Sequence, residues 1–180
     1  IAELRETLSA AKFLVVDGHS HDRTVEIAKN LDVNILYQDG LGKGNAIAKA
    51  IRCTDFDDVD YVVLIDADYT YPAEQIPAMI KILQENPQVG MVCGNRFTSQ
   101  LDIKAMHNLF YFGNKLLAFT HNLLNGVTLN DPLTGLRVVR AEILRGWKIK
   151  SQRFDLEVEI NHLVEKKGFD IVEVPIKYRQ

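Results

Sequence analysis

Cysteine is scarce in this chain, and its scarcity removes two classes of small protein. The two cysteines among the 180 residues are Cys53 and Cys93, which lie far apart without a Cys-x-x-Cys spacing. A disulfide-stabilised scaffold and a cysteine-rich metal cage are therefore excluded. This cysteine usage is typical of a protein from a reducing, cytoplasmic compartment.

A long apolar run, a leader segment and a strong net charge are also missing. No stretch reaches the roughly 18 apolar residues of a membrane span, and no signal peptide precedes the first expected strand. The formal net charge is −3, so the chain has no general attraction to nucleic acid and must hold any anion with local groups. With 47% hydrophobic and 25% charged residues, residues 1–180 have the composition of one soluble domain with a substantial core.

Short apolar runs alternate with helical patterns along the chain. Strands are expected at residues 13–16, 33–37, 61–65 and 89–93. Helices are expected at residues 22–30, 46–51 and 73–84. This alternation predicts an α/β domain with a mainly parallel central sheet and helices on both faces. Residues 1–8 already have helical spacing, whereas a doubly wound domain usually opens with a strand.

The longest helical pattern covers residues 105–125 and has one strongly apolar side. Phe112 and Phe119 widen the apolar arc beyond what core packing requires. Two interpretations remain open: a helix packed between the sheet and a neighbour, or a contact with a membrane surface or lipid tail.

Two carboxylates one residue apart, Asp66 and Asp68, follow the apolar strand at 61–65. The carboxyl ends of strands are where open α/β sheets bind ligands. Because neighbouring strand side chains point to opposite faces, both acids can serve one ligand only if the strand breaks into a turn, which Pro72 favours. Such oxygens hold Mg²⁺ or Mn²⁺ when a diphosphate completes the shell. Alternatively, the acids only cap the next helix.

Polar clusters follow other expected strands as well. The segment 17–24 can cap the next helix, or Asp17 can accept hydrogen bonds from a nucleobase or ribose. The glycines of segment 40–46 let backbone N–H groups approach an anion beside Lys43, although no Ser or Thr follows the lysine as in a P-loop; a simple flexible turn is the alternative. Arg96 follows the strand at 89–93 and suits a diphosphate oxygen.

Seven short motifs, taken in order, resemble those of the family 2 glycosyltransferases of GT-A fold. They are Asp17-Gly-x-Ser-x-Asp-x-Thr24, Gly42-Lys-Gly-x-Ala46, Asp66-x-Asp68, Gly94-x-Arg96, Asp131-x-x-Thr-Gly-x-Arg137, Phe154-x-x-Glu157-x-Glu159 and Glu173-Val-Pro-Ile-x-Tyr-Arg179. Each motif is weak alone, but their order is specific and covers nearly the whole chain. The resemblance is greatest to the dolichyl- and polyprenyl-phosphate glycosyltransferases, the dolichol-phosphate mannose synthase group, and to archaeal members in particular.

The resemblance implies a metal-dependent, inverting transfer of a sugar from a UDP- or GDP-sugar to a dolichyl or polyprenyl phosphate. It implies Mg²⁺ or Mn²⁺ as cofactor, peripheral contact with the cytoplasmic face of a membrane, and no nucleic-acid partner. Donor contacts fall on Asp17, Lys43, Asp66 and Arg96, and metal ligands on Asp68 and Thr70. Acceptor contacts fall on Thr134, Arg137 and Arg179, and the reacting centre on Asp66, Asp68, Asp131 and Arg137. The mannose synthases often have a Gln at the position of Thr70, so the donor stays open.

Two departures from the family's pattern concern the ends of the chain. The family's first strand, which carries a Pro and an Asn-Glu pair, is missing before the opening helix. The basic, glycine-containing segment that usually follows the position of Arg179 is missing as well. We therefore expect a single GT-A catalytic domain that lacks the first strand and is trimmed at both ends.

Other functional classes compete with this interpretation. The run Asp66-Ala-Asp68-Tyr-Thr70 also fits the nucleophile motif of haloacid-dehalogenase-type phosphatases, in which Asp66 would be phosphorylated and Asp68 would act as acid and base. That motif belongs on a first strand, and here it follows a later one. A processive polysaccharide synthase would carry a Gln-x-x-Arg-Trp motif, which is absent. A non-catalytic nucleotide-sugar binding fragment is the remaining alternative.

Overall fold

The computed structural model describes residues 1–97, 128–151 and 156–179. The first half contains α1 (Ala2–Thr7), β1 (Leu14–Asp17), α2 (Thr24–Asn30), β2 (Asn34–Tyr37), α3 (Lys43–Cys53) and β3 (Tyr61–Leu64). The second half contains η1 (Ala73–Gln75), α4 (Ile76–Glu85), β4 (Val89–Asn95), β5 (Arg137–Arg140), α7 (Ala141–Leu144), α8 (Leu156–Lys166) and β6 (Asp170–Pro175). The expected strands and helices are found with shifted ends, and the pattern at residues 105–125 lies outside the described residues.

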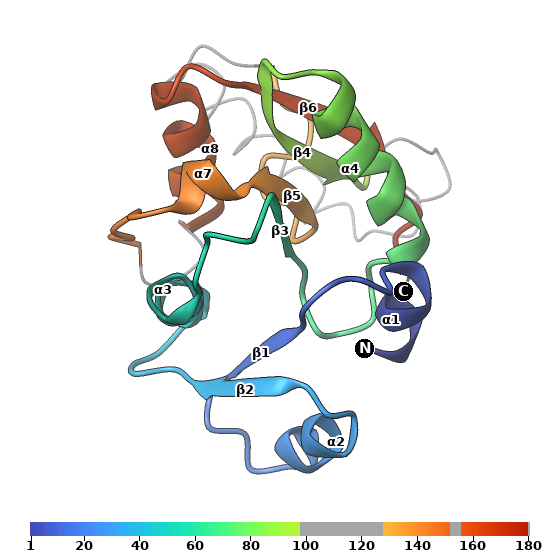
Figure 1. Ribbon diagram of the computed structural model, residues 1–180, viewed down its shortest axis with the longest axis vertical. Helices are drawn as coiled ribbons and strands as arrows, with labels where there is room; N and C mark the ends of the chain where they lie inside the picture. The colour runs from blue at the N-terminus through green and yellow to red at the C-terminus, as the bar shows by residue number, and fades with distance from the viewer. Residues whose placement is uncertain (98–127, 152–155, 180) are drawn as a thin grey trace.

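The described strands form two sheets, with the smaller one below β3 in Figure 1. β1 and β2 pair in parallel. The larger sheet has the order β3-β5-β4-β6, in which β4 and β6 are parallel and β5 is antiparallel to both of its neighbours. The α/β class is confirmed, while the one central sheet that we expected is divided in the described part of the chain. A run of apolar residues indicates that a strand is buried, but it does not indicate which strands lie beside it or in which direction the strand runs relative to them.

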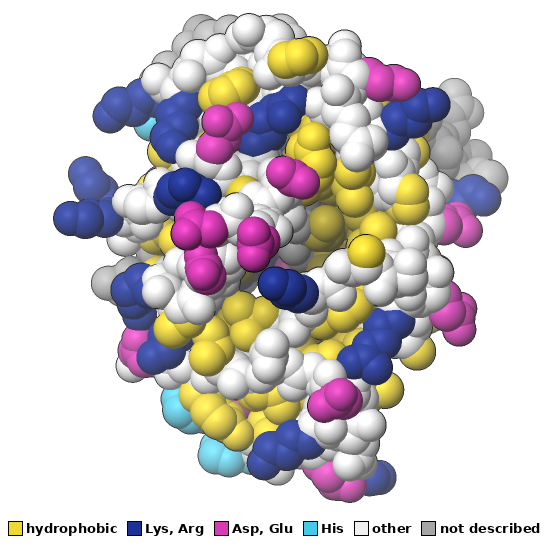
Figure 2. Space-filling view, viewed as in Figure 1, with side chains coloured by type: hydrophobic (Ala, Val, Ile, Leu, Met, Phe, Trp, Pro, Cys, Tyr) yellow, Lys and Arg dark blue, Asp and Glu magenta, His cyan; other side chains and the backbone are white. Residues whose placement is uncertain are grey.

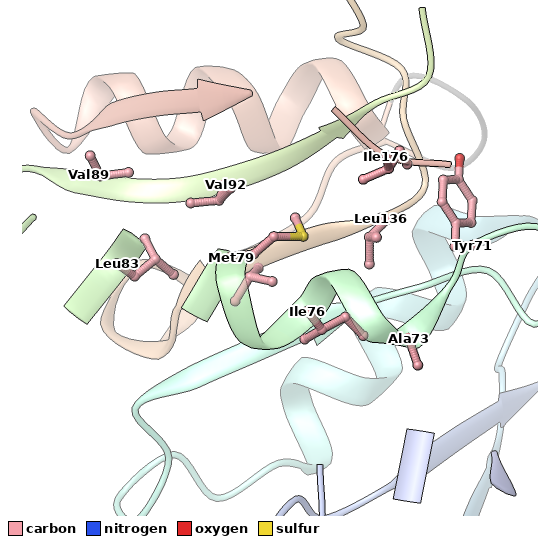
Figure 3. Close-up of a cluster of buried hydrophobic side chains, with 10 residues drawn as sticks. Tyr71, Ala73, Ile76, Met79, Leu83, Val89, Val92, Leu136 and Ile176 are labelled. Atoms are coloured by element: carbon pink, nitrogen blue, oxygen red, sulfur yellow. The ribbon is translucent and has the colours of Figure 1, made fainter. Parts of the chain in front are cut away.

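Two apolar clusters cover the two faces of the larger sheet. Neighbouring side chains of a strand point to opposite faces of the sheet. Accordingly, Val138 belongs to the first cluster and Val139 to the second. The first cluster contains Ile76, Met79 and Leu83 of α4 (Figure 3). The second contains buried residues of α7 and α8. Helices therefore cover both faces, as the sequence predicted.

One edge of the larger sheet gathers the polar motifs. β3 and β4 run in the same direction, because both are antiparallel to β5, and so they end at the same edge. The register places Arg137 opposite both Leu64 and Cys93. The turn at residues 131–136 consequently enters the sheet where β3 and β4 end, and β5 brings this turn to the candidate site.

The surface has no large field of one charge on the face drawn in Figure 2. Acidic and basic side chains are interspersed there, and apolar side chains are exposed in the hollow at its centre. This mixed surface agrees with the net charge of −3. On this face, any anion would therefore be held by local side chains rather than by a general field of positive charge.

Candidate active site at the strand ends

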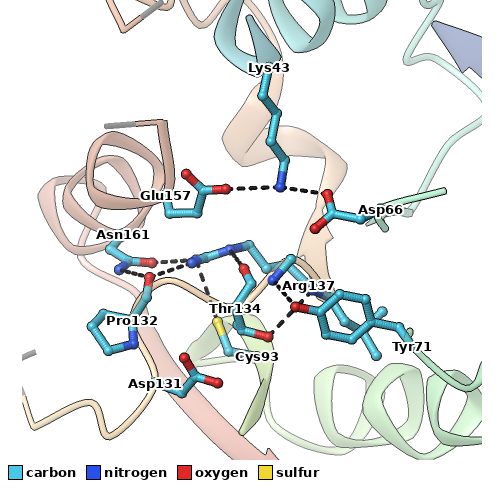
Figure 4. Close-up of polar contacts among 12 residues, drawn as sticks. Lys43, Asp66, Tyr71, Cys93, Asp131, Pro132, Thr134, Arg137, Glu157 and Asn161 are labelled. Atoms are coloured by element: carbon cyan, nitrogen blue, oxygen red, sulfur yellow. Dashed lines mark hydrogen bonds and ion pairs between the residues drawn. The ribbon is translucent and has the colours of Figure 1, made fainter. Parts of the chain in front are cut away.

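Lys43 lies between two carboxylates at the edge where β3 ends (Figure 4). It is the first residue of α3 and follows Gly42, whose φ of 86° allows the tight turn. Its Nζ atom lies 2.7 Å from Oδ1 of Asp66 and 2.9 Å from Oε1 of Glu157. Burial alone would lower the pKa of Lys43, but the two carboxylates outweigh burial and raise it, which keeps the ammonium charged.

Glu157 is the partner that sequence reasoning did not include in the site. It lies in the first turn of α8, and its side chain is 7% exposed. The motif Phe154-x-x-Glu157 is visible in the sequence, but the motif alone did not indicate a role for Glu157. The signal that could have found it is the combination of that motif with a lysine motif at the start of another helix.

Gly135 makes the closest approach to Asp66. A Cβ atom at position 135 would lie 2.0 Å from Oδ2 of Asp66 and 3.0 Å from Cε2 of Tyr71. The backbone N–H of Gly135 also donates to the Tyr71 hydroxyl oxygen at 2.7 Å, and burial raises the pKa of that hydroxyl. Asp66 is thus paired with Lys43 on one side, and on the other side its carboxylate occupies space that a side chain at position 135 would need. Nothing in the sequence indicated the contact between residues 71 and 135.

Replacing Gly135 by alanine is expected to impair the site more than the fold. The new methyl group would overlap Oδ2 of Asp66, so the carboxylate has to move, which disturbs its ion pair with Lys43. We expect donor affinity to fall by about tenfold or more, the effect of losing a charged contact. Calorimetric titration with nucleotide sugars and a thermal melt check this expectation. Normal donor affinity in the variant would show that the position of Asp66 is unimportant.

The two residues predicted to bind metal share one turn. β3 ends at Leu64, and Tyr69 takes a positive φ of 67°, so the strand breaks into a turn as the sequence required. The backbone N–H and the hydroxyl of Thr70 donate to Oδ1 of Asp68 at 3.1 and 2.6 Å. Asp68 itself is exposed.

The protein donors on this turn are oxygens, which suit Mg²⁺ or Mn²⁺. Within the described ranges no cluster of three or more His, Cys, Asp or Glu side chains gathers to hold a cation. A divalent cation bound at Asp68 would need further ligands from elsewhere. A site with few protein ligands is typical of a cation that is bound together with the phosphates of a substrate. The assignment of Asp68 and Thr70 as metal ligands stays a prediction.

Arg96, which directly follows β4, forms a largely buried ion pair with Asp131. Nε and Nη2 of Arg96 donate to the two carboxylate oxygens at 2.7 and 2.8 Å, and the side chains are 13% and 1% exposed. Burial alone would lower the pKa of Arg96, but Asp131 outweighs burial and raises it. Glu173 accepts the backbone N–H groups of Asn130 and Asp131 at 2.7 and 2.6 Å. The donor role of Arg96 and the reacting-centre role of Asp131 stay predictions.

Arg137 and Thr134 are buried inside the turn rather than exposed at its surface. The Arg137 guanidinium donates to the carbonyl oxygens of Pro132 at 2.6 Å and Thr134 at 3.0 Å, and to Oδ1 of Asn161 at 2.5 Å. In this structure Arg137 therefore holds the turn against α8 (Figure 4). The acceptor contacts that the resemblance gave to Arg137 and Thr134 remain predictions, and for Arg137 they would require these bonds to open.

Arg179 lies beside the turn that contains Asp68 and Thr70. Its guanidinium makes two hydrogen bonds of 2.8 Å to Glu3 and lies 4.3 Å from the centre of the Tyr69 ring. Its backbone N–H donates to the Thr70 carbonyl at 2.8 Å. The hydrogen bonds from Arg179 lower the pKa of Glu3 to about 2. Arg179 thus contacts the turn directly, while its contact with an acceptor phosphate stays a prediction.

Asp17 lies in the smaller sheet, at the end of β1. It is 4% exposed, and its carboxylate accepts the backbone N–H of Ser20 at 2.9 Å. The hydrogen bonds with Ser20 lower the pKa of Asp17. The hydrogen-bond partner of Asp17 is therefore within its own loop, which agrees with the interpretation that segment 17–24 caps the next helix. The contact of Asp17 with a nucleobase or ribose stays a prediction.

An α/β domain with basic and acidic side chains at the carboxyl ends of its strands belongs to the class that binds ligands at that edge. The chain is a member of the family described as glycosyl transferase family 2, whose model matches residues 1–147. This match confirms the resemblance seen in the motifs, and it confirms the expectation of a glycosyltransferase. It removes the support for a haloacid-dehalogenase-type phosphatase.

Two of the curated relatives come from the archaeon Haloferax volcanii. The chain is 33% identical over 178 residues to the dolichyl-phosphate hexose transferase of Haloferax volcanii, covering 98% of this chain and 73% of that protein. It is 31% identical over 168 residues to glycosyltransferase AglJ of the same organism, covering 93% of this chain and 54% of that protein. The chain thus spans only part of the length of these relatives.

Solved structures confirm the fold. Glucosyl-3-phosphoglycerate synthase from Mycobacterium tuberculosis in complex with UDP aligns with a TM-score of 0.74 at 19% identity, over 100% of this chain and 66% of that one. The same enzyme with Mn²⁺, UDP-glucose and glycerol 3-phosphate aligns with a TM-score of 0.72 at 19% identity, over 100% and 67% of the two chains. The GT-A architecture that the motifs implied is therefore present. In the described part of the chain, no helix combines the length and apolar character needed to cross a bilayer.

Proposed function

We propose that this chain is the catalytic domain of a hexosyltransferase that moves a sugar from a nucleotide diphosphate sugar to a dolichyl or polyprenyl phosphate. The observation that carries the proposal is the Lys43–Asp66–Glu157 cluster beside the turn of Asp68 at the carboxyl edge of the strands. The name of the Haloferax relative supports the acceptor and the hexose. The complex of the structural neighbour with Mn²⁺ and UDP-glucose supports the donor class and the cation.

The proposed reaction needs positioning more than proton transfer. An oxygen of the lipid phosphate forms a bond to the anomeric carbon while the bond from that carbon to the diphosphate oxygen breaks, with inversion. A phosphate monoester is already largely anionic near neutral pH, so a strong general base is unnecessary. The protein must instead hold two anionic groups near each other and compensate the charge that develops on the leaving diphosphate.

The described side chains can perform this work. The Lys43 ammonium provides a fixed positive charge where the donor is proposed to bind, and it orients the Asp66 carboxylate. The absence of a side chain at Gly135 leaves room for the Asp66 carboxylate in this position. Asp68 and Thr70 would hold Mg²⁺ or Mn²⁺, and the cation when bound would stabilise negative charge on the diphosphate.

A lipid acceptor also requires the site to reach a membrane surface. We therefore propose peripheral association with the cytoplasmic face of a membrane. The apolar pattern at residues 105–125 is the candidate contact on the basis of its sequence alone.

Transfer to lipid is the experiment that tests this function. The protein is incubated with polyprenyl phosphate, MnCl₂ or MgCl₂, and radiolabelled UDP-glucose, UDP-N-acetylglucosamine or GDP-mannose, and the label is extracted into organic solvent. We expect one donor to give a labelled lipid and a chelator to suppress it. Release of free sugar without labelled lipid would contradict the proposed acceptor, and no turnover of any donor would favour a non-catalytic binding fragment.

A further inference from the structure

We propose that Lys43 and Glu157 together bind a hydroxyl group of the sugar that the donor carries. This inference rests on the proposed function and deepens it, because it assigns a subsite for the transferred sugar to a residue that the sequence motifs left without a role. The structural basis is one buried acceptor atom and one adjacent donor group at the edge of the site.

The buried acceptor atom is Oε2 of Glu157. The other oxygen of this carboxylate is paired with Lys43 at 2.9 Å, whereas Oε2 is buried and has no hydrogen-bond partner in the described structure. Leaving a carboxylate oxygen buried without a donor is costly, so an atom of this kind that lies at the candidate site is suited to accept a hydrogen bond from a bound group. Glu157 lines a small pocket whose other walls are Lys43, Leu64, Gly135, Arg137, Leu156 and Ile160.

The adjacent donor group is the Lys43 ammonium. An ammonium has three N–H groups, and two of them point at Asp66 and Glu157. The third can donate to a ligand. A free donor and a free acceptor therefore lie side by side, which matches a hydroxyl group, since a hydroxyl both accepts and donates a hydrogen bond.

The chemistry of the pair does not suit the phosphate groups of the proposed substrates, and the nucleobase, which also carries donors and acceptors, is predicted to lie at Asp17 instead. A phosphate offers only acceptor oxygens near neutral pH and would be repelled by the Glu157 carboxylate, and a polyprenyl phosphate carries no hydroxyl on its chain. The hydroxyl groups available are those of the transferred sugar and those of the ribose. Because Lys43 also holds Asp66, next to the turn of Asp68 where the diphosphate is proposed to bind, we assign the subsite to the transferred sugar.

Glu157→Gln tests the assignment, since the amide keeps the size of the side chain but removes the charged acceptor. Binding of UDP and UDP-glucose, and of GDP and GDP-mannose, is measured by calorimetry with MnCl₂ for the wild type and the variant. We expect the wild type to bind the nucleotide sugar more tightly than the nucleotide. We expect Glu157→Gln to lose about tenfold or more in affinity for the nucleotide sugar and to bind the nucleotide as the wild type does.

Glu165→Gln is the matched control. Glu165 also lies on α8 and also has a buried oxygen without a partner, but it is at the far end of the helix. We expect both affinities to be unchanged in this variant. UDP-glucose analogues that each lack one hydroxyl provide a second measurement on the wild type, which needs no variant to fold. Removal of one particular hydroxyl should reproduce the loss seen in Glu157→Gln.

Three results would overturn the subsite. The first is equal weakening of nucleotide and nucleotide sugar in Glu157→Gln, which would place the effect on the ribose or diphosphate. The second is a wild type that binds the nucleotide sugar no more tightly than the nucleotide. The third is an analogue series in which no hydroxyl matters. Failure of the wild type to bind any nucleotide would instead overturn the proposed function, and the subsite with it.

Discussion

Replacing Asp68 by alanine is expected to abolish metal-dependent donor binding and to reduce sugar transfer by about a hundredfold or more. Asp68 is exposed, and its carboxylate hydrogen-bonds to Thr70 within its own turn. Its loss therefore removes little packing, so the melting temperature should change little. The measurements are calorimetric titration of UDP-glucose and GDP-mannose with and without MnCl₂, transfer to polyprenyl phosphate, and a thermal melt.

The control for this variant is Asp58→Ala. Asp58 is also an exposed acid, but it lies before β3 rather than after it, at the other end of the strand. This substitution makes the same change in charge and should leave donor binding as it is. Donor affinity that still depends on Mn²⁺ in Asp68→Ala would show that the cation is held elsewhere, and the roles given to Asp68 and Thr70 would then be wrong.

Much of the fold was predictable because burial leaves a clear trace in the sequence. The apolar run at 61–65 and the run at 89–93 became β3 and β4, and every residue of β4 is buried. Strand direction leaves no such trace. Val138 and Val139 indicate a buried strand, but the antiparallel insertion of β5 between β3 and β4 depends on tertiary pairing.

The candidate site was likewise predictable only in part. The sequence placed Lys43 and Asp66 in loops that follow strands, and the structure joins them at 2.7 Å. It could not anticipate that Gly135 contacts the Asp66 carboxylate, because that contact arises from the direction of β5. It also could not anticipate that Arg137 is enclosed by carbonyl groups, since a motif shows which residues recur and not which way they face.

Replacing Asp131 by asparagine is expected to cost about 3–5 kcal/mol of unfolding free energy, the usual penalty for removing one member of a buried ion pair. The variant leaves the Arg96 guanidinium 13% exposed and without its carboxylate, so a charge remains in the interior without compensation. For a domain of this size, each kcal/mol lowers the melting temperature by about 2–4 °C. Urea unfolding without ligands measures this loss separately from any catalytic role of Asp131.

The doubly substituted protein separates the cost of an unpaired charge from the value of the pair. If Arg96→Met is combined with Asp131→Leu, no buried charge remains, and we expect the double variant to be more stable than either Asp131→Asn or Arg96→Met alone. Glu26→Gln is the control, because the ion pair of Glu26 with Arg23 is largely exposed and should contribute less than about 1 kcal/mol. An Asp131→Asn protein as stable as Glu26→Gln would mean that the Arg96 pair does not hold the turn, and the turn that positions Gly135 against Asp66 would need another anchor.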